Sequence, residues 1–100
     1  MILIYIPCGD GKEAKHIGKE LVSRKLIACA NVFPIESIYM WEGKAVDEGE
    51  VALLCKTSEA NHEKVAEAVR ELHSYDVPAI IRINAEANKQ YSEWVDKETS

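Results

Sequence analysis

Long apolar runs and an excess of positive charge are both missing from this chain of 100 residues. No stretch approaches the roughly 20 consecutive apolar residues that a helix needs to span a membrane. The 12 lysines and arginines stand against 17 acidic residues, which gives a net charge of −5. A surface for nucleic acid or for an anionic membrane requires a positive patch. The composition therefore predicts neither nucleic acid nor a membrane as a partner.

Cysteine is also scarce, because only Cys8, Cys29 and Cys55 occur and their number is odd. Residues 1–6 are apolar, but this stretch is too short for an export signal and no basic segment precedes it. Thiols of proteins that are not exported usually stay reduced. We therefore expect a cytoplasmic protein with unpaired cysteines, folded as a single domain over residues 1–100.

The first quarter of the chain predicts a strand followed by a helix. Apolar residues fill the stretch 2–7, and an apolar stripe with helical spacing then covers about 11–25. Asp10 is expected to cap this helix, with Glu13 three residues later as the partner in a capping box. Gly18 lies inside the stripe, where glycine weakens a helix, so it predicts a close approach of the helix to the sheet.

A long β-hairpin is predicted at the centre of the chain, with its tip at Trp41-Glu42-Gly43-Lys44. Both arms are rich in β-branched, aromatic and aliphatic residues. The first arm is expected over 28–41 and the second from about Glu50 to Thr57. Pro34 cannot donate a hydrogen bond to a neighbouring strand, so a bend or bulge is expected there.

The second half of the chain repeats the pattern of helix and strand. An apolar stripe from Val65 to Leu72 predicts a second helix, residues 79–84 a fourth strand, and Asn88 the cap of a short last helix. The order β-α-β-β-α-β is typical of an α+β, ferredoxin-like sandwich with both helices on one face of the sheet. Because the strands are apolar on both faces, the other face should be covered by further copies of the chain.

Three groups of residues are candidate metal ligands. Cys29 and Cys55 would lie near each other across a hairpin centred on Gly43, as a soft pair suited to Cu(I), or they are simply buried core residues. His73, at the end of the second helix, is either a metal ligand or a favourable charge at the helix terminus.

The acidic cluster Asp47, Glu48 and Glu50 suits hard divalent cations, although charged loops are more often only solvated. No pattern of an enzyme site is present: there is no Gly-x-Ser-x-Gly, no phosphate-binding glycine loop and no Cys-x-x-Cys. The strand order also fits an RNA-recognition motif, but residues 51–55 carry none of the aromatic side chains that such a module requires on that strand.

Four motifs give the chain a family resemblance. Leu26–Asn31, Tyr39–Lys44, Lys56-Thr57 and His73–Pro78 closely resemble the CutA (divalent-cation tolerance) family, in order and over nearly the whole chain. The resemblance implies a non-enzymatic, ferredoxin-like subunit of a homotrimer, similar in architecture to the PII signalling proteins. It also implies tolerance of Cu²⁺ or another divalent cation, with no organic cofactor. The alternative that it leaves open is a PII-like regulatory trimer with a small ligand in the clefts between subunits.

The resemblance also assigns positions. It places Trp41, Glu42, Gly43 and Lys44 near the contacts between subunits, and Lys56, Tyr75 and Glu42 are the polar candidates at the clefts. Some family members have a cysteine in the first strand and a histidine doublet before the tyrosine. The corresponding residues here are Ile6 and Leu72-His73, so His73 alone matches that set, and Cys8 lies two positions further along.

Overall fold

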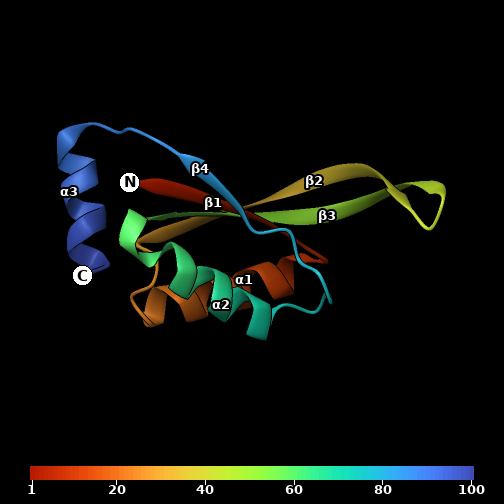
Figure 1. Cartoon of the computed structure of the whole chain (residues 1–100), viewed down its shortest axis with the longest axis horizontal. Helices are drawn as coiled ribbons and strands as arrows, with labels where there is room; N and C mark the ends of the chain where they lie inside the picture. Colours follow the sequence, from red (N-terminus) through yellow and green to blue (C-terminus); the bar gives the residue numbers. More distant parts are fainter.

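Four antiparallel strands form one sheet in the order β2-β3-β1-β4, and two helices lie against one of its faces (Figure 1). The structure is a computed structural model and describes residues 1–100. The ferredoxin-like α+β fold predicted from the sequence is confirmed. The elements are β1 (Ile2–Cys8), α1 (Gly11–Ser23), β2 (Cys29–Trp41), β3 (Lys44–Thr57), the 3-10 turn η1 (Glu59–Asn61), α2 (His62–Leu72), β4 (Ile81–Asn84) and α3 (Lys89–Glu98).

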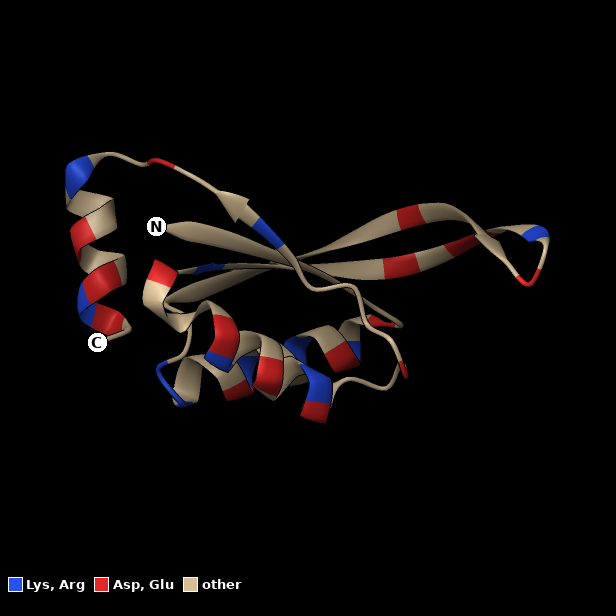
Figure 2. Cartoon of the chain, viewed as in Figure 1, with Lys and Arg blue, Asp and Glu red and all other residues tan.

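The β2–β3 hairpin extends far beyond the rest of the molecule and accounts for its longest dimension, in an envelope of 45 × 25 × 21 Å (Figure 1). Strand β1 ends at the pair Cys8–Val51, so residues 35–50 have no third strand beside them. We call residues 35–50 the arm. Most of the charges on it are acidic (Figure 2).

The structure of the hairpin differs in two respects from what the sequence predicted. Strand β3 begins at Lys44 and not near Glu50, because the polar stretch between them pairs with β2 despite its weak strand propensity. The register between β2 and β3 runs unbroken from Cys29–Lys56 to Trp41–Lys44, so Pro34 causes no bulge. Strand β2 is at the edge of the sheet, where the missing N–H of proline breaks no ladder.

The hairpin tip is a two-residue turn at Glu42 and Gly43, as the sequence predicted. Their φ angles are 48° and 79°. Positive φ at both central positions defines the turn whose twist suits a β-hairpin, and glycine adopts it without steric cost.

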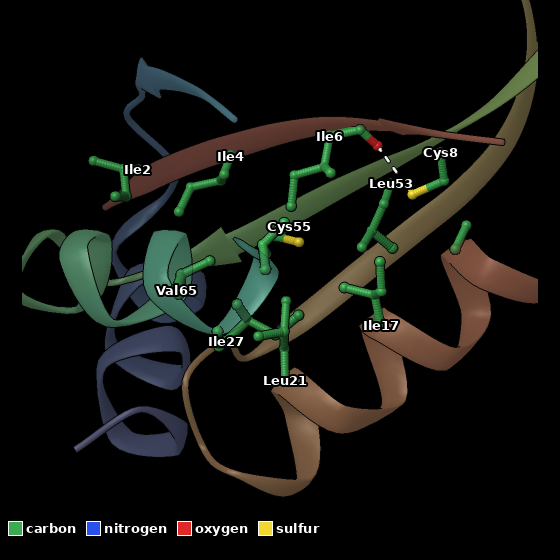
Figure 3. Packing of buried hydrophobic residues seen from close by; sticks show 13 residues of the cluster. Ile2, Ile4, Ile6, Cys8, Ile17, Leu21, Ile27, Leu53, Cys55 and Val65 are labelled. Carbon is green, nitrogen blue, oxygen red and sulfur yellow. Dashed lines mark hydrogen bonds between the residues drawn. The ribbon is translucent and has the colours of Figure 1, made fainter. Parts of the chain in front are cut away.

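The hydrophobic core lies between the sheet and helices α1 and α2 (Figure 3). Ile2, Ile4 and Ile6 of β1 point into it, and Leu53 of β3 faces them across the strand pair. A Cβ atom on Gly18 of α1 would lie 3.2 Å from Leu53 Cδ1, so the expected close approach of this helix to the sheet is confirmed.

The opposite face of the sheet is not covered by any helix over most of its area. Since side chains alternate along a strand, Leu3 and Tyr5 of β1 point to this face, together with Ile81 and Ile83 of β4 and Phe33 of β2. Ile81 is 48% exposed, Ile83 42% and Phe33 37%. An apolar surface of this kind is typical of a contact between molecules.

The helices differ from the predicted ones at their ends. Helix α2 begins at His62, because Ser58 opens the 3-10 turn η1 and not the α-helix itself. Val22 of α1 is 44% exposed, because it lines an open groove between this helix and edge strand β2, opposite Ala30 and Val32.

Replacing Leu53 with alanine should lower the free energy of unfolding by about 2–5 kcal/mol, because it removes a fully buried side chain where helix and sheet are closest. Chemical denaturation at one fixed protein concentration measures the change. Val77→Ala is the control: its side chain is 89% exposed, so the change should stay within about 0.5 kcal/mol. Equal effects of the two substitutions would contradict this placement of the core.

Candidate functional site

Three potential metal ligands meet where β1 ends. Cys8 is the last residue of β1, Glu13 lies in the first turn of α1, and His73 follows the last residue of α2. One ligand atom from each, the thiol sulfur, a carboxylate oxygen and a ring nitrogen, lie within 4.8 Å of one another. The cysteine and the histidine are buried and Glu13 is half-buried, so the donors form a recessed cluster.

Glu13 connects the start of α1 to the loop after α2. Its backbone N–H donates to Asp10 Oδ1 at 2.8 Å, which confirms the predicted cap. Its side chain does not return to the N–H of Asp10, as a capping box requires, but accepts from Gly9 N–H at Oε1, 3.0 Å. The second oxygen, Oε2, accepts from Ser74 N–H at 2.8 Å, although the two residues are 61 positions apart.

Both ring nitrogens of His73 are engaged in hydrogen bonds. Nδ1 accepts from the backbone N–H of Tyr75 at 3.1 Å. A backbone amide can only donate, so Nδ1 carries the lone pair and the ring proton lies on Nε2. Nε2 therefore donates to the carbonyl oxygen of Pro7, 2.9 Å away. These two bonds fix the tautomer and the orientation of the imidazole.

The surroundings favour a protonated thiol and an ionised carboxylate. Burial, helped by the negative charges of Glu13, Glu50 and Asp10, raises the pKa of the Cys8 thiol to about 12. The thiol is 3.6 Å from the carbonyl oxygen of Ile6, toward which it donates (Figure 3). Partial burial by itself would raise the pKa of Glu13, but the hydrogen bonds from Ser74 and Gly9 outweigh it, so this pKa is lowered.

The donor set suits a borderline divalent cation. Thiolate, imidazole and carboxylate are the protein ligands of Zn²⁺, and the first two also bind copper. A cation at this point would replace the thiol proton of Cys8 and would offset the negative charge of Glu13. Three protein donors are one fewer than a closed tetrahedral zinc site has, so one position remains for water or another ligand.

Of the residues predicted as metal ligands, only His73 belongs to this cluster. Cys29 pairs with Lys56 across the hairpin, and Cys55 pairs with Ala30, so the register differs by one residue from the one that would face the two thiols. A shift of one residue turns a side chain to the other face of a sheet. Cys55 is accordingly buried in the core, while Cys29 contacts Tyr91 Oη at 3.4 Å on the far side.

The residues predicted for a ligand cleft lie in separate places in a single chain. Trp41, Glu42, Gly43 and Lys44 are at the exposed tip of the arm, and Lys56 lies over the sheet, where its ammonium donates to the Asn31 side chain. Tyr75 lies instead beside the metal-ligand cluster. Only further copies of the chain could bring these groups together.

The acidic residues of the arm do not form a ligand cluster within one chain either. The Glu48 carboxylate accepts a hydrogen bond from the Tyr39 hydroxyl, and Glu50 accepts one from the Tyr75 hydroxyl at 2.7 Å. The single group of potential metal ligands in the structure is the one at Cys8, Glu13 and His73.

Comparison with known proteins gives a consistent result along the whole chain. The family model described as CutA1 divalent ion tolerance protein matches residues 2–98. The divalent-cation tolerance protein CutA of Pyrococcus horikoshii is 42% identical over 100 residues, which cover 99% of this chain and 98% of that protein. No helix of this chain is long and apolar enough to cross a membrane.

Solved structures agree with the fold. The periplasmic divalent cation tolerance protein CutA from Archaeoglobus fulgidus superposes with a TM-score of 0.96 at 37% identity, over 100% of both chains. The PII-like protein CutA from Nostoc sp. PCC 7120, in its apo form, gives a TM-score of 0.93 at 29% identity, over 100% of this chain and 98% of that one. Both similarities extend over the arm as well as the body.

The bonds of Glu13 to two separate loops predict a pH-dependent contribution to stability. Glu13→Gln should lower the free energy of unfolding at pH 7 by about 1–3 kcal/mol, since one oxygen acceptor and the charge are lost. A lowered carboxyl pKa stabilises the fold above the unfolded value of about 4.3 and ceases to do so as the pH falls through the folded value. The difference from the wild type should therefore shrink as the pH falls below about 4.3.

Denaturation in the presence of a chelator measures this effect without any contribution from bound metal. Glu86→Gln provides the control, because it removes the charge of a carboxylate on an exposed residue. A cost of Glu13→Gln that stayed constant from pH 7 to pH 3 would show that the carboxylate charge is not what the two loops require.

Proposed function

The chain belongs to the CutA1 divalent ion tolerance family, and we propose that it acts as a cytoplasmic homotrimer that binds a borderline divalent cation, Cu²⁺ or Zn²⁺, at Cys8, Glu13 and His73. The single observation that supports this site most strongly is the convergence of three different donor types within 4.8 Å. We propose no catalytic role, because the only nucleophile of the cluster is a thiol whose pKa burial raises to about 12, which keeps it protonated.

Binding at this cluster should be modest in affinity and dependent on pH. A cation has to displace the proton of a thiol whose pKa is raised to about 12. It also has to compete with the hydrogen bonds that already occupy His73 and Glu13. These costs favour cations with a high affinity for sulfur over Mg²⁺ or Ca²⁺, which prefer oxygen ligands. The proposed role is therefore reversible binding, as tolerance requires, and not a permanent structural metal.

The uncovered face of the sheet supports the trimer. Leu3, Tyr5, Phe33, Ile81 and Ile83 form an apolar surface that no element of the same chain covers. The arm exposes further apolar side chains: Trp41 lies on the same face of the hairpin as Phe33, and Ile38 and Met40 lie on the opposite face. Burial of apolar surface at about 25 cal/mol per Å² is the main favourable term in such an association.

A second candidate function is a PII-like regulatory trimer with a small ligand in the clefts between subunits. Lys56 supports it, because its ammonium lies on the uncovered face with an amide partner and no carboxylate. A ligand with negative charge would suit such a position. Calorimetry with Cu²⁺ and Zn²⁺ beside a panel of nucleotides separates the two functions: heat with the cations alone supports the first, and heat with a nucleotide supports the second.

Sedimentation at micromolar concentration should give a mass near three times 11.2 kDa. Ile81→Lys should dissociate the assembly, because it places a charge in the surface that we expect to be buried between subunits. Val22→Lys is a matched control: Val22 is 44% exposed and Ile81 48%, but Val22 belongs to α1, on the helix-covered side of the sheet. A monomeric wild type, or equal dissociation by both variants, would contradict the proposed use of the sheet face.

Cys8→Ser should weaken the binding of Zn²⁺ or Cu²⁺ by about tenfold or more, since even residues that only hold a ligand in place contribute that much. Cys29→Ser, the control, changes a thiol outside the cluster and should leave the affinity within about twofold. The wild-type affinity should rise by up to about tenfold per pH unit between pH 6 and pH 8, because binding displaces a proton. Loss of binding in Cys29→Ser and not in Cys8→Ser would refute the proposed site.

A further inference from the structure

Tyr75 joins the proposed metal site to the arm. Its backbone N–H donates to Nδ1 of His73, its ring packs on the imidazole with centroids 4.6 Å apart, and its hydroxyl donates to Glu50 Oε2 at 2.7 Å. Glu50 is the first residue of β3 beyond the last pair with β1, and so lies at the root of the arm. The loop after α2 passes this point on its way to β4 (Figure 1).

The Tyr75–Glu50 hydrogen bond is the only one between a side chain of the arm and the rest of the molecule. The other side-chain hydrogen bond of the arm joins Tyr39 to Glu48, both within it, and no ion pair reaches the arm from the body. Within one chain, the arm beyond Val51 and Pro34 is a two-stranded ribbon, which is marginally stable by itself. Tyr75 is therefore the one side chain of the same chain that holds the root of the arm by a hydrogen bond.

Ligation of His73 cannot leave the Tyr75 amide in place. If the cation takes Nδ1, the lone pair that accepts the Tyr75 N–H is used. If it takes Nε2, the proton of the neutral ring moves to Nδ1, where it faces the Tyr75 N–H, and two donors cannot bond each other. In both cases the hydrogen bond between Tyr75 and His73 is lost.

A bound cation also competes with the hydrogen bond that Ser74, in the same loop, makes to Glu13. Ser74 N–H is bonded to Glu13 Oε2, and a carboxylate that ligates a cation has less electron density to offer an amide donor. A cation at the site thus weakens two consecutive attachments of residues 74 and 75. Release of Tyr75 from His73 removes the hydrogen bond and the ring contact that position its hydroxyl beside Glu50.

We propose that occupation of the Cys8–Glu13–His73 site by a divalent cation releases Tyr75 and so loosens the arm, which carries the exposed Ile38, Met40 and Trp41. The inference rests on the proposed function, since it requires a cation at that site. A molecule that contacts the arm would therefore meet a looser arm when the metal site is occupied. Tyr75 is a positioning residue in this scheme and does not ligate the metal.

Hydrogen–deuterium exchange of the full chain tests the coupling, with Zn²⁺ as the probe. Amides of residues 35–50 should exchange at least about threefold faster at saturating Zn²⁺ than in the presence of a chelator. In Glu50→Ala these amides should exchange fast without the cation, and Zn²⁺ should add little. Glu48→Ala, the matched control, removes the neighbouring arm carboxylate that bonds Tyr39, and the response to Zn²⁺ should persist.

Reciprocity supplies an independent readout. If the cation loosens the arm, then removing the Tyr75–Glu50 bond in advance must favour the cation, so Glu50→Ala should bind Zn²⁺ about fivefold more tightly or better. Glu48→Ala should bind as the wild type does. Unchanged affinity in Glu50→Ala would overturn the coupling.

Different results would refute the coupling to the arm alone or the metal site itself. Binding of Zn²⁺ that depends on Cys8 but leaves the exchange of the arm unchanged would overturn the coupling and leave the site intact. Absence of Zn²⁺ binding, or binding that Cys8→Ser does not weaken, would overturn both the site and the coupling.

Discussion

The hydrogen bonds of Glu13 and His73 are the constraint on which the rest of this structure depends. They join the end of β1, the start of α1 and the loop after α2 at one point, where β1 ends and the sheet narrows to the two strands of the arm. The imidazole of His73 is buried and both of its ring nitrogens have partners, while Glu13 is half-buried. Loss of a partner at such a place leaves a buried group unsatisfied, which is costly. The same groups are good metal ligands, so stability and metal binding draw on one set of atoms.

The helices cover only one face of the sheet, and this leaves apolar side chains exposed on the other face. Helices α1 and α2 bury one side of β1 and β3, whereas Ile81, Ile83 and Phe33 remain exposed on the other. The trimer that we propose would cover this second face, and it would bring the arm of one copy against another. The coupling that we infer through Tyr75 would then act between subunits and not only within one.

The sequence predicted the strands, helices and their order well, because hydrophobic periodicity follows directly from burial on one face. It failed where periodicity is weak: residues 44–50 are mostly polar, yet pairing with β2 makes them a strand. The proposed thiol pair, Cys29 and Cys55, failed through a register error of one residue. Cys8 and Glu13 were not foreseen as partners of His73, because about 60 residues separate them and only the fold brings them together. The one available signal was a cysteine directly before a capped helix.

The most direct test of this account is the position of a bound cation. Crystals of the protein grown with Zn²⁺ should show anomalous scattering at the zinc edge between the Cys8 sulfur, the Glu13 carboxylate and the His73 ring. The account also predicts that the Tyr75 amide no longer faces Nδ1 in those crystals. Zinc bound elsewhere, at Cys29 or along the acidic residues of the arm, with the hydrogen bonds of His73 unchanged, would contradict it.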